Sequence, residues 1–344
     1  MRDSFTGNGL LLEGRRGGEG SPSGPPTPPA PVTAGPTNST REQRDIDTLR
    51  DWAVSQGVFL SDDIMLQEDK QTGAWGVVSR LHSNLASGER MIVVDRYKPG
   101  PEPGTYEIKK LAGRLKMSQN GDAEEVQQFL VEKTRNDENF GVVMKIPPHL
   151  VMSSLMLDSS SRNLVRESMA EQGIPESVQS SFCLVIVFLD EWSKGRTSTW
   201  HPYLQSLPKK LSIGLYWDAT EREYAEKIGL GSSLKTHESL YEGFQKTLDS
   251  VCPGHTYDPQ LVKWAFSTVW TRSWKSSYTS STGEQVVSIV CLGDLFNHRA
   301  DHNVYIEQDS PDSPVAMVLM DPCDGDLHLN YGSVENPAHF PVVC

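Results

Sequence analysis

The sequence predicts an α+β protein in which a long helical segment interrupts short strands. Strand-like runs lie between residues 64 and 94 and again from residue 286, whereas helical spacing dominates from about 160 to 275. The helical patterns cover five segments: 160–172, 178–192, 219–228, 235–250 and 258–272. This order favours a helical block inserted into a small β domain over alternating βαβ units.

Apolar spacing places the individual elements. A first helix is indicated by Ile46, Leu49, Trp52 and Ala53, with Gly57 as a stop signal. Short strands are expected at 64–66, 75–78 and 88–94, with glycines at the turns. The apolar core resumes at 142–147, and the longest apolar run, 183–189, is typical of a buried helix.

Composition and charge disfavour several classes of protein. The chain has 344 residues, with no run of 18 apolar residues and no apolar signal core, so we expect neither a membrane span nor secretion. Its five cysteines form no CxxC pair, which predicts reduced thiols and neither a metal site nor disulfides. The net charge of −13 disfavours nucleic acid and suits a basic protein or peptide partner. We therefore expect an intracellular monomer in the cytoplasm or nucleus, with organellar targeting left open.

Two polar segments differ from the rest of the chain. Residues 1–41 are dominated by Gly, Pro, Ser and Thr, a composition that predicts a disordered tail because it buries too little apolar surface. Residues 95–140 carry Pro, Gly and Asn-Gly signals and resemble a surface insertion, with a short helix expected at 123–133. The ordered domain is expected at 42–340, with its helical inserted region at about 155–280.

The first candidate site is Asp294-x-x-Asn297-His298, directly after the strand-like run 286–290. Its polar side chains either face a ligand or bond the backbone of a tight turn. A metal site that uses His298 and His302 lacks a second ligand cluster, and we do not favour it.

Two further segments offer candidate groups. The alternating run 327–332 ends at Tyr331-Gly332, where Tyr331 is either a strand aromatic or a functional hydroxyl. Arg272 closes the predicted helix 258–272, where it either complements the helix dipole or pairs with a ligand carboxylate. We assign packing and turns, but no chemistry, to the block 189–208.

Taken together, the order of these blocks resembles the SET-domain protein methyltransferases related to the Rubisco large-subunit methyltransferase. The matching blocks are Gly73-Ala74-Trp75-Gly76-Val77 with Gly88-Glu89, the segment 189–208 with Tyr216-Trp217, Trp264-Ala265 with Thr271-Arg272, Asp294-x-x-Asn297-His298, and the segment 325–336 with Tyr331-Gly332. They extend over roughly residues 45–340.

The resemblance implies a SET domain of short, mostly antiparallel sheets and an S-adenosyl-L-methionine-dependent protein-lysine N-methyltransferase. Tyr331 would be the catalytic tyrosine at the methyl-transfer centre. Arg272 would hold the cofactor's carboxylate, Asn297 and His298 would bind its amino-acid and adenine parts, and Asp294 would support their loop.

The same resemblance implies roles for two other segments. Ala74, Trp75 and Gly76 would form the turn against which the cofactor lies, with Trp75 packed on it. Trp274, two residues after the arginine, would line the substrate channel with Tyr331. An aromatic residue at this position favours lysine over the histidine that one branch of the family methylates.

The chain also departs from the family pattern. Gly73 stands where the family often has an acidic or polar residue, and the sequence stops eight residues after Asn336, where the family continues into a helical substrate-binding domain. We therefore interpret 341–344 as a truncated end. The alternatives are a weak or inactive SET-like protein that acts as a binding or regulatory module, a histidine-directed methyltransferase, and a fragment that folds poorly.

Overall fold

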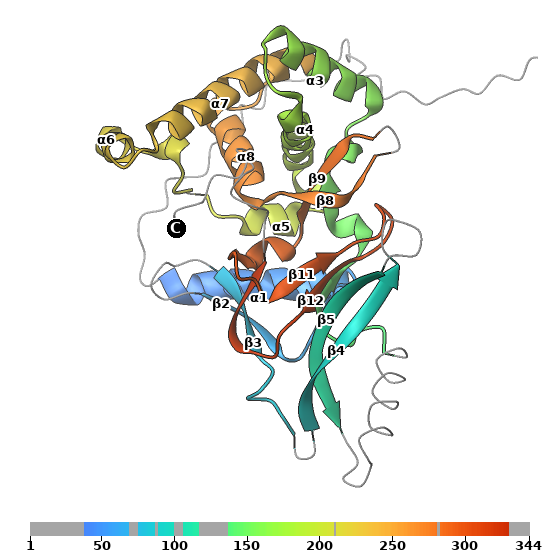
Figure 1. The fold of residues 1–344 in the computed structure, drawn as a ribbon. Coiled ribbons are helices and arrows are strands. Elements are labelled where there is room, and N and C mark those ends of the chain that lie inside the picture. The colour runs from blue at the N-terminus through green and yellow to red at the C-terminus, as the bar shows by residue number, and fades with distance from the viewer. Residues whose placement is uncertain are drawn as a thin grey trace, which may run out of the picture. The chain divides into compact units, whose positions relative to one another are not determined.

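The computed structural model describes residues 38–68, 75–86, 89–99, 106–116, 137–209, 211–280 and 283–329. The chain divides into two compact units, Met1–Ser39 and Thr40–Cys344, and nearly all described residues belong to the second. That unit has the predicted α+β class, because short, mostly antiparallel sheets precede and follow a run of helices (Figure 1). None of the helices in these ranges is long and apolar enough to cross a membrane.

One four-stranded antiparallel sheet has the order β1-β6-β12-β11. Its strands are β1 (Phe59–Leu60), β6 (Val142–Ile146), β12 (Val315–Leu319) and β11 (Val304–Glu307). Met144 and Met317 face each other in the register and are both fully buried. The sheet thus joins segments from both ends of the sequence.

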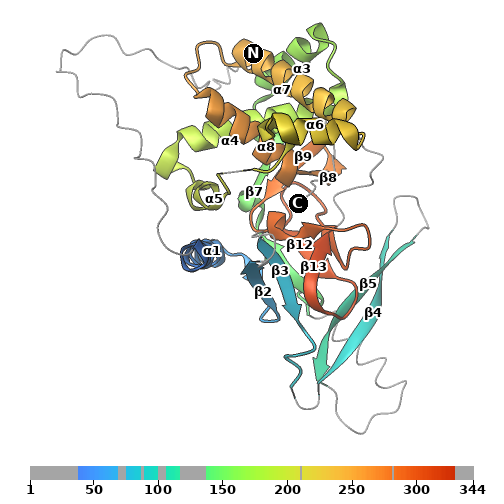
Figure 2. The ribbon, with the colours of Figure 1, turned by 90° about the vertical axis from the view of Figure 1, so that its left-hand side faces the viewer.

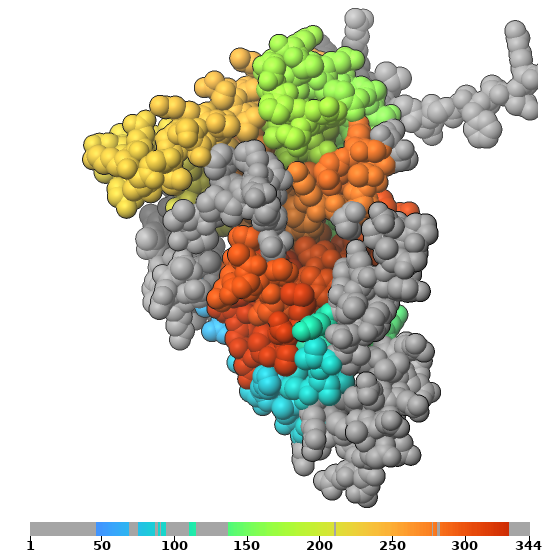
Figure 3. Space-filling model, viewed as in Figure 1, coloured from blue at the N-terminus to red at the C-terminus, as the bar shows by residue number. Residues whose placement is uncertain are grey.

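A second four-stranded sheet has the order β10-β13-β3-β2. Its strands are β10 (Asn297–His298), β13 (Asp324–Leu329), β3 (Trp75–Arg80) and β2 (Ile64–Glu68). β10 runs parallel to β13, whereas the other neighbours are antiparallel. In the space-filling view, the late residues in red and the early residues in cyan lie side by side (Figure 3).

A long hairpin occupies part of the segment expected to be a polar insertion. It pairs β4 (Glu89–Pro99) with β5 (Tyr106–Lys116) along their whole length. Leu111 of β5 is buried and packs with Val142 and Val318. β4 extends the strand expected at 88–94, whereas β5 was not predicted, because its apolar residues are interspersed with charged ones and do not alternate regularly. The helix expected at 123–133 lies outside the described residues.

The helical segment matches the sequence prediction closely. Helices cover the five predicted segments: α3 (Ser159–Glu171), α4 (Gln179–Ser193), α6 (Ala219–Lys227), α7 (Gly231–Val251) and α8 (Pro259–Arg272). Asp158, Asp218 and Asp258 cap the N-termini of α3, α6 and α8 by accepting backbone N–H bonds, as short acidic side chains do at this position. Both ribbon views place these helices together, away from β2 to β5 (Figures 1 and 2).

Helix α4 lies at the centre of the helical segment. Its apolar run 183–189 is buried throughout, as predicted. Phe182 of α4 meets Phe244 of α7 edge to face at a centroid distance of 5.2 Å, and Phe266 of α8 at 6.3 Å. Such aromatic pairs add to the free energy gained by burial and hold the three helices together.

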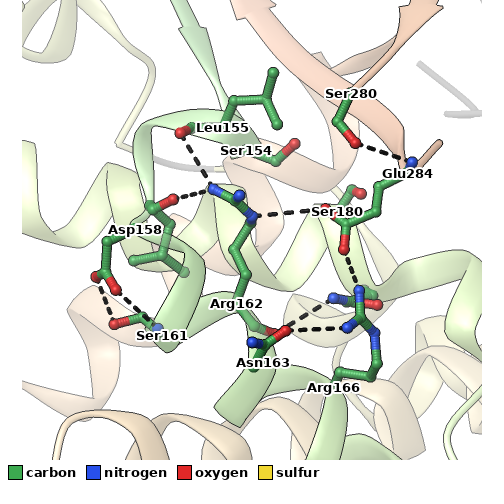
Figure 4. A network of polar contacts seen from close by, with 12 residues as sticks. Ser154, Leu155, Asp158, Ser161, Arg162, Asn163, Arg166, Ser180, Ser280 and Glu284 are labelled. Atoms are coloured by element: carbon green, nitrogen blue, oxygen red, sulfur yellow. Dashed lines mark hydrogen bonds and ion pairs between the residues drawn. The ribbon is translucent and has the colours of Figure 1, made fainter. Parts of the chain in front are cut away.

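Charged groups fasten α3 to a third sheet, which comprises β7 (Val151–Ser153), β9 (Gln285–Val290) and β8 (Trp274–Thr279). Arg166 of α3 pairs with Glu284, the residue before β9, and the Arg162 Nε atom lies 3.6 Å from the same carboxylate (Figure 4). Arg162 also donates to the carbonyl group of Leu157. The network fixes the helical segment onto the strands that lead to the candidate site.

Candidate functional site

The site begins at a sharp turn after the buried strand β9. Leu292 has φ 63°, the only left-handed non-glycine residue in the described ranges, and it is fully buried. A bulky side chain in this conformation costs free energy, and the burial of Leu292 helps to offset that cost. The chain then enters a short 3-10 helix, η6 (Gly293–Leu295), which carries Asp294.

The carboxylate of Asp294 is buried and receives two side-chain donors. Arg272 Nη1 lies 2.6 Å from Asp294 Oδ2, and the Tyr203 hydroxyl donates to the same oxygen at 2.9 Å. The side chain of Asp294 is 1% exposed and that of Arg272 is 21% exposed. Among the described residues no partner reaches the other oxygen, Oδ1. A buried charge requires such partners, so this pair fixes the end of α8 against η6.

Tyr203 contacts Asp294, although it was not among the site residues predicted from the sequence. It lies on α5 (His201–Ser206), within the block to which we assigned only packing and turns. Burial, and next the charge of Asp294, raise the pKa of Tyr203 well above its ordinary value. Its hydroxyl therefore stays protonated and donates. The two residues are 91 positions apart, and nothing in a single sequence pairs them.

Asn297 and His298 follow on β10, with both side chains exposed. In the register they lie beside His328 and Leu329 of β13. The backbone N–H of Arg299 then donates to the carbonyl group of Leu329 at 3.0 Å. This pairing holds the Asn297-His298 segment as a strand while its side chains remain accessible to a ligand.

Gly76 lies next to Asn297, although the two residues are far apart in sequence. A β-carbon at Gly76 would lie 3.0 Å from Asn297 Nδ2, which is tighter than an ordinary van der Waals contact. Glycine is thus the residue that lets the Asn297 amide approach β3. Trp75, the preceding residue, is half-buried.

Trp274 packs on the turn that carries Asp294. It is 5% exposed, and its ring atom Cη2 lies 3.0 Å from the place where a β-carbon on Gly293 would be. Among the predicted site residues, the structure thus brings Arg272, Trp274 and Asp294 together, with Asn297 and Gly76 in contact nearby. Ala74 and Tyr331 lie outside the described residues.

The recorded partners of Asp294 distinguish the two interpretations of its motif. The 3-10 helix has no side-chain cap, and the bonds of Asp294 go to two side chains from distant segments. Asp294 therefore connects α5 and α8 to η6, and its recorded bonds do not cap the backbone of the turn.

Across the described ranges, no group of three or more His, Cys, Asp or Glu side chains could hold a metal ion.

No protein-family model matches this sequence, and no curated protein sequence does. The solved structures that match this chain include Rubisco LSMT bound to AdoMet, at 15% identity and a TM-score of 0.47. They also include the SET domain of LSMT bound to MeLysine and AdoHcy, at 15% identity and 0.49, and Rubisco LSMT bound to sinefungin and monomethyllysine, at 14% and 0.48.

Each alignment covers 84% of this chain and 53% of the other. The chain thus spans about half the length of the structures that it matches.

Proposed function

We propose that this chain is an S-adenosyl-L-methionine-dependent protein-lysine N-methyltransferase. The observation that carries the proposal is the ion pair between Arg272 and the buried Asp294. Asp294 comes shortly before Asn297 and His298 in the chain. Asn297 in turn touches Gly76. Three motif blocks that are far apart in the sequence thus meet in one region, and this supports a cofactor site shared between them.

The residues of this region fit the chemistry of the cofactor. S-adenosylmethionine carries a carboxylate, an amino group and an adenine ring. Arg272, oriented by Asp294, would hold the carboxylate, since a guanidinium group suits carboxylate geometry. The exposed Asn297 amide and the backbone at His298 would bind the amino group and the adenine ring, and Trp75 with Ala74 and Gly76 would form the adjoining wall. When bound, the cofactor supplies a methyl group activated by its sulfonium charge.

We assign Tyr331 to the methyl-transfer centre. The described part of β13 ends at Leu329, which lies beside His298 in the register, and Tyr331 follows two residues later. This short separation supports a tyrosine next to the cofactor residues. Its hydroxyl would orient the incoming amine, which must be neutral because an ammonium group has no lone pair to attack with.

We propose a lysine-containing protein as the substrate. The net charge of −13 suits a basic partner surface. Trp274 lies two residues after Arg272 and packs against Gly293, and we assign it to the wall of the substrate channel. Apolar surroundings lower the pKa of a lysine and favour its neutral form.

The proposal is tested by separating cofactor binding from transfer. Calorimetry with S-adenosylmethionine should show binding for the wild type and for Tyr331→Phe, and weaker binding for Asn297→Ala. Transfer of labelled methyl groups to a proteome extract should fall at least 100-fold in Tyr331→Phe, whereas Tyr224→Phe, which removes a hydroxyl from an exposed helix position, should match the wild type.

Two outcomes would overturn the proposal in different ways. If the wild type does not bind S-adenosylmethionine at millimolar concentration, the proposed cofactor site is wrong. Binding without transfer, in wild type and variants alike, would leave a binding or regulatory module on the same scaffold.

A further inference from the structure

His328 lies on β13 directly beside a candidate cofactor residue. In the register it is the partner of Asn297 on the parallel strand β10. On the other side of β13, Leu327 pairs with Val77 of β3, and both of these side chains are buried in the core. Because successive side chains of a strand alternate between its two faces, His328 and Gly76 belong to the opposite face of the sheet.

The side chain of Asn297 lies on that same face. Its Nδ2 atom is 3.0 Å from the place where a β-carbon on Gly76 would be. His328 therefore shares one face of the sheet with Asn297 and Gly76, two residues that we assign to the cofactor site. Since His328 is only half-buried, part of its side chain remains accessible to a ligand on this face.

The surroundings of His328 favour a neutral ring at pH 7.5. Burial, and next the positive charge of Arg299, lower the pKa of His328, whereas the negative charges of Asp326 and Asp301 act in the opposite direction. An unperturbed histidine already titrates near 6.5. The ring thus carries no charge at pH 7.5 and gains a positive charge when the solution becomes sufficiently acidic.

Other titratable groups come from the same three strands. His298 follows Asn297 on β10, and the alternation of side chains directs it to the other face. Asp324 of β13 and Arg80 of β3 are opposite each other in the register, farther along the face that carries His328. Because carboxylates and guanidinium groups keep their charge between pH 5.5 and 7.5, His328 is the one of these residues on the face of Asn297 whose charge changes in that range.

We propose that His328 belongs to the S-adenosylmethionine site and that its protonation makes the site favour the product, S-adenosylhomocysteine, over the cofactor. This inference rests on the function proposed above. S-adenosylmethionine carries a sulfonium charge that S-adenosylhomocysteine lacks. A protonated ring on the binding face therefore repels the cofactor more strongly than the product. The neutral ring at pH 7.5 imposes no such bias, so product inhibition increases in acid.

The first test measures the affinities of both ligands by calorimetry on the full chain at pH 7.5 and pH 5.5. In the wild type, the affinity for S-adenosylmethionine relative to that for S-adenosylhomocysteine should fall about 5-fold at the lower pH. In His328→Gln, which keeps a polar side chain without a titratable group, the ratio should change by less than about 2-fold. His149→Gln removes an exposed histidine of η1 (Pro148–Leu150) and should behave as the wild type does.

The outcomes separate this inference from the proposed function. The role of His328 is wrong if the ratio of affinities does not change with pH in the wild type, or if it falls equally in His328→Gln. It is also wrong if His298→Gln, rather than His328→Gln, removes the fall. In each of these cases both ligands still bind, so the proposed cofactor site stands. If neither ligand binds at either pH, the proposed cofactor site fails, and the role of His328 fails with it.

The second test measures the reciprocal effect on the wild-type chain. Linkage requires that a ligand which binds the protonated form about 5-fold less tightly lowers the pKa of His328 by about 0.7. NMR titration of a histidine-labelled chain should show this lower pKa in the complex with S-adenosylmethionine relative to that with S-adenosylhomocysteine. The His328 signal is the one that is missing in His328→Gln. Equal pKa values of His328 in the two complexes would overturn the proposal.

Discussion

The Tyr203 hydroxyl donates a hydrogen bond of 2.9 Å to Asp294, a carboxylate that is almost fully buried. The same oxygen accepts from Arg272, so a tyrosine from α5 and an arginine from α8 converge on one turn. If either Tyr203 or Arg272 is replaced, the buried carboxylate of Asp294 loses one of its two hydrogen-bond donors. The geometry of the candidate cofactor site therefore depends on a residue outside its motifs.

Tyr203→Phe is expected to lower the free energy of unfolding by about 1.5–3 kcal/mol, because it removes a hydrogen bond to a charged group. Urea unfolding measures the change. Tyr224→Phe is the matched control, since that side chain is 64% exposed and its hydroxyl reaches solvent. Equal stability of the two variants would mean that the Tyr203 hydroxyl adds nothing at Asp294.

Arg272→Leu should cost about 3–5 kcal/mol, because it leaves the buried Asp294 carboxylate without its cation. Adding Asp294→Asn in the same chain should recover part of that loss, since the uncompensated charge is then gone. A double-mutant cycle in urea measures the coupling. If the double variant lost the sum of the two single losses, the ion pair would carry no coupling energy.

Gly76→Ala is expected to weaken S-adenosylmethionine binding about 5- to 30-fold, because the new methyl group displaces the Asn297 amide. The melting temperature should change little, since Asn297 is exposed and can move. Asn297→Ala should weaken binding by a similar factor, and the double variant should be no weaker than either single one. Calorimetry measures the binding free energy of each variant. If the losses in the two single variants add up in the double variant, Gly76 and Asn297 affect binding independently.

The stability of the fold should decline on the acid side through His237. Burial lowers its pKa to about 4, whereas an unfolded histidine titrates near 6.5. The neutral ring therefore contributes stability that is fully present above pH 6.5 and is lost as the pH falls toward 4, by at most roughly 3 kcal/mol.

His237→Phe keeps a ring between Phe266 and Trp270, to which His237 is adjacent at 5.6 and 5.5 Å. This variant should lose much of the dependence of stability on pH between 6.5 and 4, as followed by thermal melting across that range. His149→Gln removes an exposed histidine and should leave the profile unchanged. If the melting temperature of His237→Phe depends on pH as that of the wild type does, residues other than His237 cause the loss of stability in acid.

Periodic segments were predictable from the sequence because burial imposes the helical spacing directly. The five predicted helices agree with α3, α4, α6, α7 and α8 to within a few residues at each end. Helix α5 was not predicted, since its six residues are too few to show a period. The strand β5 was missed because its apolar residues are interspersed with charged ones and show no regular alternation.

The contacts among the candidate site residues could not be predicted from the sequence. Order and spacing indicated Arg272, Asp294 and Asn297, yet the carboxylate that Arg272 contacts is Asp294 itself. Long-range side-chain pairs leave no local trace in one sequence, and Tyr203 was missed for that reason. The cofactor-binding and catalytic roles of all the candidate residues, the division into domains and the cellular compartment stay predictions.

The pairing of β3 with β13 affects folding during synthesis as well as the stability of the folded chain. Asp324 accepts a hydrogen bond from the backbone of His82, 242 residues earlier, so β3 leaves the ribosome long before its neighbour exists. Until then β3 has β2 on one side and an open edge on the other. A nascent chain that has formed β2 and β3 but not yet β13 would present an unpaired strand edge, and such an edge favours chaperone binding or aggregation.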